Sequence, residues 1–332
     1  MQLDGFAYVE LTGPDTAKVE GTLDRLGFTP AATHPTKDVV RWKQGRIDLL
    51  VNREKSGHAA DFARVHGASA SAMAFRVRDP KRAFELAVAR GAVPVDTATF
   101  ALRGVGGSLL HLVDEHVFDA WRPIAGAEAA EAKNSVGLDL LDHLTHNVRR
   151  GEMRTWSGFY GRVFDFSEQK YFDIKGRETG LFSQAMIAPD GRIRIPLNES
   201  QDDRSQIEEF IREYNGEGIQ HVALSTNDIY TTVEKLRSRG VVFQPTLDTY
   251  YELVDGRLPG HGEDLERLRR NEILVDGGEG EGLLLQIFTE NLFGPIFFEV
   301  IQRKGNDGFG NGNFQALFES IELDQIRRGV LT

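Results

Sequence analysis

Glu299 lies in an apolar stretch, Phe297 to Ile301, towards the C-terminal end of the sequence. A carboxylate in such a strand is costly to bury unless it is paired or binds a metal. His143 and His221 lie in other hydrophobic stretches, and the three residues are equally spaced along the chain. Two neutral imidazoles and one carboxylate form the facial-triad ligand set of non-heme Fe(II) enzymes, and the same set can hold catalytic zinc. The residue types thus indicate a metal site; the alternative is two structural histidines and a water-facing glutamate on an edge strand.

Four segments of the sequence share one order of elements, and these elements would have to position the three side chains. Each segment opens with a strand of alternating or apolar residues, continues through a polar cap into an amphipathic helix, and closes with further strands. The opening strands are expected within residues 5–15, 71–80, 138–148 and 218–228. The helices are expected at residues 16–26, 81–91, 153–163 and 229–240.

The second and fourth segments align residue by residue. Asp79 lies over Asp228 where the helices should begin, and Gly91 lies over Gly240 where they should end. One βαβββ unit is too small to bury its own sheet, so two units are expected to form one curved sheet. The predicted fold is α+β, with four tandem βαβββ modules in two domains, each an open curved mixed sheet with outer helices.

The predicted domain boundary lies in residues 123–137, which are rich in alanine, glycine and glutamate and could instead form a short helix. We expect an N-terminal domain of residues 1–130 and a C-terminal domain of residues 131–332. Residues 276–282 are expected to be a solvated acidic loop. Residues 313–328 have the pattern of an amphipathic helix, which could pack on the sheet and cover a cavity as a lid.

The alignment also compares the candidate ligands of the two halves. Ala72 falls at the position of His221, and Gly5 or Phe6 falls at the corresponding position of the first segment. The second half therefore carries polar ligands where the first half is expected to have none.

Two further histidines are weaker candidates for metal ligands. His146 lies three residues after His143, so on a strand it faces the opposite side. His111 lies in a strand of the first half without evident partners, and we expect it to be structural.

The composition of the chain excludes several kinds of partner and of catalytic or metal site. The chain has 332 residues and a net charge of −11, so neither a nucleic acid nor an anionic membrane is an expected partner. It has no cysteine, which excludes disulfides, thiolate metal sites and a cysteine nucleophile and fits a reducing compartment. The sequence shows no signal-peptide pattern and no apolar run of membrane-spanning length, so a cytoplasmic location is expected.

Several long motifs together resemble the bacterial 4-hydroxyphenylpyruvate dioxygenases of the vicinal oxygen chelate superfamily. They are LDHLTHNV, IPLNES followed by SQIEEFI, GIQHVAL, LLLQIFT, GPIFFEVIQRKG and GFGNGNFQALFESIE. The resemblance covers nearly the whole chain and is densest from residue 138 to residue 331. It implies a degenerate N-terminal domain without metal and a catalytic C-terminal domain, both with the fold of the glyoxalases and extradiol dioxygenases.

The resemblance also implies roles for particular residues. One Fe(II) per subunit would be held by His143, His221 and Glu299. The substrate pocket would be lined by Ser183, Asn198, Gln206, Gln220, Gln286, Phe288, Phe309, Asn313 and Phe314. Phe288 and Phe314 would hold the aromatic ring from both sides, and the C-terminal helix with Phe314 and Phe318 would be the lid.

The reaction implied by the resemblance converts 4-hydroxyphenylpyruvate and O2 to homogentisate and CO2, a step of tyrosine and phenylalanine catabolism. It combines decarboxylation, ring hydroxylation and side-chain migration, and the enzyme would be a homo-oligomer, dimer or tetramer. The nearest alternative is 4-hydroxymandelate synthase, which oxidises the benzylic carbon on the same scaffold; Pro196 and Phe297 favour the dioxygenase. A metal-free binding protein of the superfamily and a glyoxalase-like zinc or nickel isomerase fit less well, because the first is much shorter and the second needs another acidic ligand.

Overall fold

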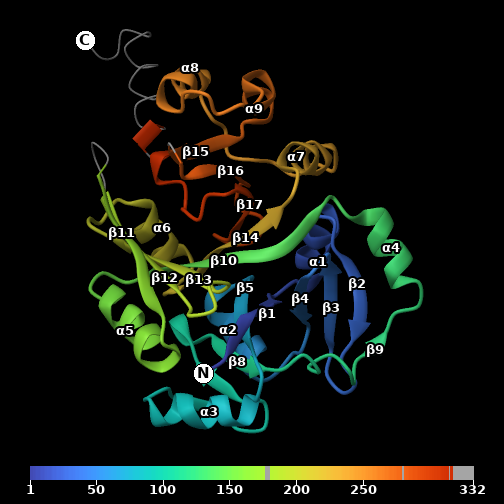
Figure 1. Cartoon of the computed structure of the whole chain (residues 1–332). Coiled ribbons are helices and arrows are strands. Elements are labelled where there is room, and N and C mark those ends of the chain that lie inside the picture. The colour runs from blue at the N-terminus through green and yellow to red at the C-terminus, as the bar shows by residue number, and fades with distance from the viewer. Residues whose placement is uncertain (176–179, 279, 314, 317–332) are drawn as a thin grey trace.

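The computed structural model describes residues 1–175, 180–278, 280–313 and 315–316, and in it the chain forms two sheets flanked by helices (Figure 1). A nine-stranded sheet has the order β6-β7-β8-β5-β1-β4-β3-β2-β9. Its strands are β1 (Leu3–Thr12), β2 (Thr29–Thr33), β3 (Val39–Gln44), β4 (Ile47–Asn52), β5 (Ser69–Val77), β6 (Pro94–Asp96), β7 (Ala101–Arg103), β8 (Leu109–Val113) and β9 (Arg122–Pro123).

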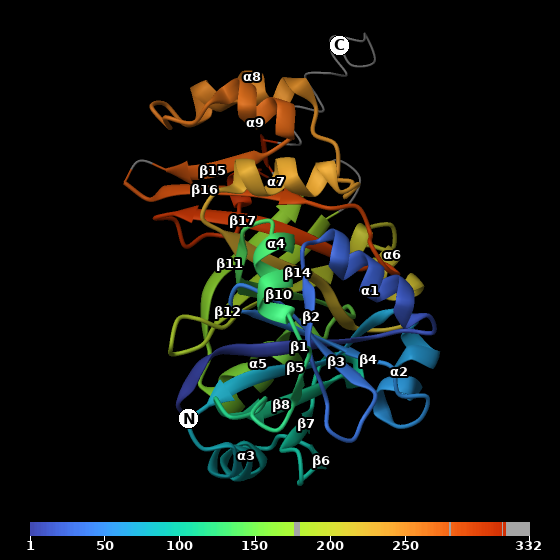
Figure 2. The same ribbon diagram turned by 90° about the vertical axis from the view of Figure 1, so that its right-hand side faces the viewer.

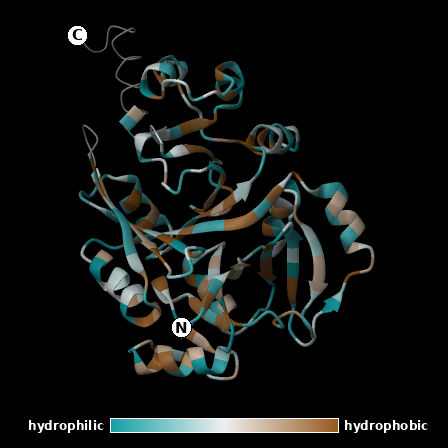
Figure 3. Ribbon diagram, viewed as in Figure 1, coloured by the Kyte–Doolittle hydropathy of each residue, from teal (hydrophilic) through white to brown (hydrophobic). Residues whose placement is uncertain are grey.

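The second sheet has eight strands in the order β11-β12-β13-β10-β14-β17-β16-β15. They are β10 (Leu138–Val148), β11 (Ser167–Lys175), β12 (Gly180–Ile187), β13 (Arg194–Ser200), β14 (Gly218–Thr226), β15 (Leu274–Gly278), β16 (Gly282–Phe288) and β17 (Phe297–Lys304). The long strand β10 crosses the middle of the molecule in Figure 1, and Figure 3 colours much of it as hydrophobic.

The helices lie around the two sheets, and α7 packs against β17 while α4 packs against β2 (Figure 2). Their bounds are α1 (Thr16–Arg25), α2 (His58–His66), α3 (Pro80–Ala89), α4 (Ala127–Asn134), α5 (Met153–Phe164), α6 (Gln206–Glu213), α7 (Ile229–Ser238), α8 (Asp248–Arg257) and α9 (Leu265–Asn271), with a 3-10 turn at Val105–Gly107. Among the described residues, none of these helices has the length and hydropathy needed to span a bilayer.

The four predicted βαβββ units are confirmed. They are β1-α1-β2-β3-β4, β5-α3-β6-β7-β8, β10-α5-β11-β12-β13 and β14-α7-β15-β16-β17. Two opening strands meet antiparallel at the centre of each sheet, β1 with β5 and β10 with β14. Each opening strand also runs parallel to the last strand of its own unit. The two sheets therefore have matching strand order and register, which allows residues to be compared between the halves.

Local sequence determines where the helices of the two aligned units begin and end. The side chain of Asp79 accepts a hydrogen bond from the backbone N–H of Arg82 at 3.0 Å, and Asp228 accepts one from Thr231 at 3.1 Å. Gly91 and Gly240, which follow α3 and α7, have φ values of 93° and 78°. The left-handed conformation that ends both helices is therefore occupied by the residue that adopts it without strain.

Three parts of the chain refine the sequence-based expectations. Residues 127–134 of the expected linker form α4, the short helix considered above. Helices α8 and α9 are inserted between α7 and β15, where no helix was predicted. The acidic glycine stretch is not wholly a loop, because Asp276 to Gly278 belong to β15 and Gly282 begins β16.

The two halves share one hydrophobic core. Phe75 of β5 packs edge to face against Phe164, with ring centroids 5.4 Å apart, and stacks on Phe166 at 6.0 Å. Val136, Leu138 and Leu144 belong to the same buried cluster as the interior of the first sheet. This continuous core holds β10, and with it the candidate site, against the N-terminal half.

Candidate metal centre

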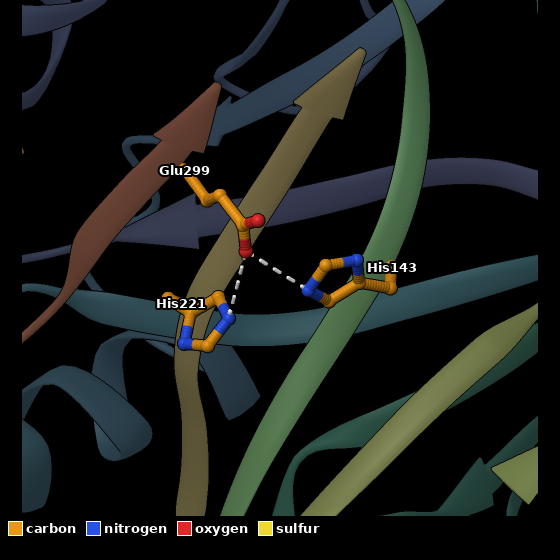
Figure 4. Close-up of side chains that lie close together, drawn as sticks. All are labelled: His143, His221 and Glu299. Atoms are coloured by element: carbon orange, nitrogen blue, oxygen red, sulfur yellow. Dashed lines mark ion pairs between the residues drawn. The ribbon is translucent and has the colours of Figure 1, made fainter. Parts of the chain in front are cut away.

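Three neighbouring strands bring His143, His221 and Glu299 together (Figure 4). His143 on β10, Ala223 on β14 and Glu299 on β17 lie in one row across the sheet. His221 lies two residues before Ala223, so it projects from the same face of β14. The small side chain of Ala223, fully buried in the row, leaves room between the flanking ligands. A single carboxylate oxygen, Oε2 of Glu299, lies 3.1 Å from Nε2 of His143 and 3.4 Å from Nε2 of His221.

Hydrogen bonds at the far side of each ring fix which nitrogen faces the site. Nδ1 of His143 lies 2.9 Å from a carboxylate oxygen of Asp142, and Nδ1 of His221 lies 3.0 Å from the amide oxygen Oε1 of Gln220. Both partners are acceptors, so each Nδ1 carries the proton and donates. The Nε2 lone pairs then face the carboxylate of Glu299. Three acceptors that converge in a buried space are satisfied by a proton or a cation between them, and a metal ion fits this arrangement.

Burial and charge act on these groups in opposite directions. Burial opposes ionisation of Glu299, but His143 and His221 outweigh it and lower the pKa of this carboxyl to about 2. Burial lowers the pKa of His221, whereas the pKa of His143 is raised, because Glu299 and Asp142 overcome the effect of burial. Glu299 is therefore an ionised carboxylate inside the protein, and it attracts positive charge to the space between the rings.

A buried ion pair supports one of the two histidines. Arg303 of β17 donates from Nε and from Nη2 to the two carboxylate oxygens of Asp142, both at 2.8 Å. Burial would raise the pKa of Asp142, but Arg303 and His143 hold it far below its usual range. Asp142 thus remains an anion behind His143, whereas the corresponding partner of His221 is a neutral amide. The negative partner strengthens His143 as an electron donor.

The same guanidinium holds the turn that follows β17. Nη1 of Arg303 donates to the backbone carbonyls of Asn306 at 3.0 Å and Gly308 at 2.7 Å. The next residue, Phe309, places its ring 5.4 Å from the ring of His143 in an edge-to-face arrangement. Arg303 therefore connects the support of a metal ligand to a wall of the cavity.

The three ligands open into a cavity of about 330 Å³. Six residues that the sequence assigned to the substrate pocket line it, namely Ser183, Asn198, Gln206, Gln220, Phe288 and Phe309. Ser183 and Asn198 are directly opposed on β12 and β13. His221 stacks on Phe297, with ring centroids 4.7 Å apart, and Phe288 lies edge to face at 6.3 Å. The cavity is thus mostly apolar, with neutral polar groups at a few positions.

Two other predicted pocket residues, Gln286 and Asn313, are buried and are not among the residues that line this cavity. The amide oxygen of the buried Gln286 faces Gly310, where a Cβ would come within 1.9 Å of it. The side chain of Asn313 accepts a hydrogen bond from the hydroxyl of Tyr250 at 2.6 Å. Both residues therefore lie beside the turn that carries Phe309. Phe314 and Phe318, predicted as ring clamp and lid, lie outside the described residues.

Sequence reasoning missed several side chains of the cavity. The resemblance did not include Thr145, Phe172, Ile174, Leu181, Ile207, Gln244 and Asn311. Leu181 lies two residues before Ser183, and Phe172 is opposite Ser183 on β11, so strand alternation around that serine could have identified both. Asp142 was missed as well, although its position directly before His143 was a usable signal.

The remaining candidate histidines lie elsewhere. Nε2 of His146 lies 2.8 Å from the hydroxyl of Tyr160 on α5, on the opposite side of β10 from the ligands. Nδ1 of His111 lies 2.5 Å from the hydroxyl of Tyr8. His111 therefore has a partner that the sequence did not reveal.

One sequence-based comparison of the halves is wrong. Tyr8 pairs with Ala74 across β1 and β5, as His143 pairs with Ala223 across β10 and β14. Tyr8, and neither Gly5 nor Phe6, therefore corresponds to His143. The register between β1 and β5 shifts on both sides of Phe6, so counting residues along β1 gives a false position. The expectation that the first half lacks polar ligands at these positions holds at Ala72, but Tyr8 and His111 are polar side chains at the other two.

Comparison with known families covers most of the chain. Residues 1–120 match the family described as hydroxyphenylpyruvate dioxygenase, HPPD, N-terminal, and residues 140–253 match the glyoxalase/bleomycin resistance protein/dioxygenase superfamily. The first match covers β1 to β8, and the second begins in β10 and ends in α8.

Individual relatives match over the full length. A 4-hydroxyphenylpyruvate dioxygenase of Pseudomonas aeruginosa is 56% identical, with 99% of this chain and 96% of that protein aligned. A Legionella pneumophila protein of the same name is 51% identical over 99% of this chain and 97% of that protein. Hemolysin VllY of Vibrio vulnificus is 54% identical over 99% of this chain and 96% of that protein.

A solved structure shares the fold. A mutant of the 4-hydroxymandelate synthase of Streptomyces coelicolor superposes with a TM-score of 0.83 at 29% identity, covering 98% of this chain and 100% of that one.

Proposed function

Because this chain belongs to the family of the 4-hydroxyphenylpyruvate dioxygenases, we propose that it converts 4-hydroxyphenylpyruvate and O2 to homogentisate and CO2. The observation that carries the proposal is the convergence of two imidazole lone pairs and one buried carboxylate on a largely apolar cavity. A 2-oxo acid with an aromatic ring fits this combination, because its polar end can chelate a metal while its ring occupies the apolar part.

Fe(II) is the proposed metal, one ion per subunit, held by Nε2 of His143, Nε2 of His221 and the carboxylate of Glu299. When bound, iron would supply the redox chemistry that joins O2 to the 2-oxo acid and the ring. Two neutral imidazoles and one carboxylate leave a divalent ion with one positive charge. The carboxylate of a 2-oxo acid would neutralise that charge, so the ligand set favours this class of substrate.

The protein would orient the substrate and exclude water. Phe288 and Phe309 provide apolar surface on either side of the ligands, and Phe297 covers the ring of His221. The neutral polar groups can hold the phenol or the keto-acid end without adding charge; they are Ser183, Asn198, Gln206 and Gln220. Removing water from the chelating end strengthens its electrostatic contacts. By resemblance, Gln286 and Asn313 belong to the same pocket, Phe314 is assigned to the ring clamp, and Phe314 with Phe318 to the lid.

Further parts of the proposal concern the whole chain. Residues 1–130 would form a metal-free domain and residues 131–332 the catalytic domain, with the division inside α4. The protein would act in the cytoplasm as a homo-oligomer, a dimer or tetramer.

Product analysis tests the function. Full-length protein reconstituted anaerobically with Fe(II) should, on addition of 4-hydroxyphenylpyruvate and O2, form homogentisate and release one CO2 for each O2 consumed. 4-Hydroxymandelate is the competing product, because the structurally similar synthase is 29% identical to this chain. If 4-hydroxymandelate forms instead of homogentisate, the chain is a 4-hydroxymandelate synthase. Absence of metal binding that depends on His221 would reject an iron enzyme altogether.

A further inference from the structure

Thr145 of β10 carries a buried hydroxyl in the wall of the metal-site cavity. The residue is 1% exposed and belongs to the cavity lining. Its oxygen Oγ1 has no hydrogen-bond partner among the described residues. Buried polar groups in folded proteins are nearly always hydrogen-bonded, and an exception has to be explained by a missing partner such as a bound molecule. This exception lies next to the site where the chemistry is expected.

The pairing of the strands places Thr145 beside the metal ligands. It is directly opposite His221 on β14, and it follows two residues after His143 on its own strand. Residues two apart share one face of a strand, so Thr145 projects to the same side as His143. On its other flank, the parallel pairing of β10 with β13 runs in one register from His143 to Val148 and sets Pro196 beside it. These neighbours of Thr145 also line the cavity, so its side chain is surrounded by cavity wall.

The neighbouring side chains do not satisfy the hydroxyl. Each ring of His143 and His221 has an acceptor of the preceding residue at Nδ1 and the carboxylate of Glu299 at Nε2. Pro196 has no polar atom in its side chain and no backbone N–H. A molecule bound in the cavity is therefore the partner that remains for Oγ1.

The chemistry of that partner follows from its place beside the ligands. A hydroxyl can donate one hydrogen bond, and a rotation about χ1 lets threonine exchange the positions of its methyl and hydroxyl groups. The part of a 2-oxo acid that lies at the metal ligands is its chelating end, which carries a carboxylate and a keto oxygen. Both are acceptors, and a hydrogen bond to a charged acceptor is stronger than one between neutral groups. The hydroxyl of Thr145 is thus suited to this end and not to the distant ring.

We propose that Thr145 is a substrate-binding residue, whose hydroxyl donates a hydrogen bond to the 2-oxo acid end of the substrate. The inference rests on the proposed function and adds a contact that selects for the chelating end. In the free protein the buried hydroxyl lowers stability because it has no partner, and in the complex the substrate supplies one.

Anaerobic titration of the Co(II)-loaded, full-length protein with 4-hydroxyphenylpyruvate tests the contact. Thr145→Val keeps the shape of the side chain and removes the hydroxyl, so it should weaken binding about tenfold. Thr145→Ser is the matched control, because it keeps the hydroxyl, and it should bind nearly as wild type does. Phenylpyruvate lacks the phenol, and Thr145→Val should weaken its binding by the same factor.

Urea unfolding of the metal-free proteins separates this role from a structural one. Thr145→Val should be at least as stable as wild type, because it removes a buried hydroxyl that has no partner. A threonine whose hydroxyl stabilised the fold would lose stability on the same substitution. The affinity for Co(II) should be the same in both variants as in wild type, since the three metal ligands are unchanged.

The proposal is overturned if Thr145→Val binds 4-hydroxyphenylpyruvate as tightly as wild type, or if Thr145→Ser loses as much affinity as Thr145→Val. It is also overturned if Thr145→Val binds phenylpyruvate as well as wild type does. The proposed function fails separately, because binding is measured without O2. A wild-type protein that binds the 2-oxo acid through Thr145 but forms no homogentisate would refute the reaction and support the contact.

Discussion

The carboxylate of Asp142 and the guanidinium of Arg303 form a two-point ion pair, with both N–O distances at 2.8 Å, directly behind the candidate metal ligand His143. Arg303 also holds the turn that carries Phe309. The pair therefore connects the metal ligand and the cavity wall, and its removal should affect each of them in a measurable way.

Asp142→Asn should weaken metal binding about 10- to 100-fold, because the anionic acceptor behind Nδ1 of His143 is lost while its shape is kept. The measurement is an anaerobic titration with Fe(II), with Co(II) as a redox-stable second probe. Asp139→Asn on the same strand, whose carboxylate pairs with Arg46 at the surface, is the control and should bind metal as wild type does. Equal affinity in both variants would show that Asp142 has no role in holding the metal.

Arg303→Met should destabilise the fold by about 3–5 kcal/mol, since it leaves the carboxylate of Asp142 buried without its partner. Urea unfolding of the metal-free protein measures this cost. The double variant Asp142→Leu with Arg303→Met removes both charges and should regain a large part of the loss. If the two single losses simply add in the double variant, the pair is not coupled as the geometry implies.

Glu299→Ala should abolish O2 uptake with 4-hydroxyphenylpyruvate, because two imidazoles alone leave the ligand set without its charge. Oxygen consumption and bound iron should be measured on the same sample. Glu290→Ala, which removes an exposed carboxylate shortly before β17, should retain both. Turnover by Glu299→Ala would exclude Glu299 from the site.

His146→Phe should keep iron bound, since His146 faces Tyr160 and not the ligands. It should also change the response to acid. Burial lowers the pKa of His146 to about 3, so between pH 6.5 and 3 the unfolded chain binds a proton that the folded protein does not. The free energy of unfolding of wild type should therefore fall as pH decreases through this range, and the variant should lose less of it. Urea unfolding of the metal-free proteins at several pH values measures this difference in stability. Loss of iron from the variant would mean that His146, and not His143, is the metal ligand.

Much of the fold was accessible from the sequence because the modules repeat. Aligning Asp79 with Asp228 and Gly91 with Gly240 located two helices and their ends, and these positions depend on local chemistry alone. The correspondence of Tyr8 with His143 was not accessible, because irregular pairing along β1 displaces the residue count. Helices α8 and α9 were missed because they belong to one module and have no counterpart in the others.

The candidate site was predictable to the extent that its residues alternate along strands. His143, His221 and Glu299 could be proposed from type and position, and the structure brings them together. The places of Gln286 and Asn313 depend on how the turn after β17 folds back, which no local pattern specifies. The position of Asp142 directly before His143 was a usable signal, but its pairing with Arg303 is a long-range contact that no local pattern specifies.

The contacts of Arg303 also restrict how the chain can change in length. Glu299 must face the histidines, Arg303 must reach Asp142 and the carbonyls of the turn, and Phe309 must return to the ring of His143. An insertion or deletion of one residue between Glu299 and Phe309 would put at least one of these groups on the wrong side of the strand or turn. We therefore expect this segment to tolerate substitutions at outward positions but no change in its number of residues.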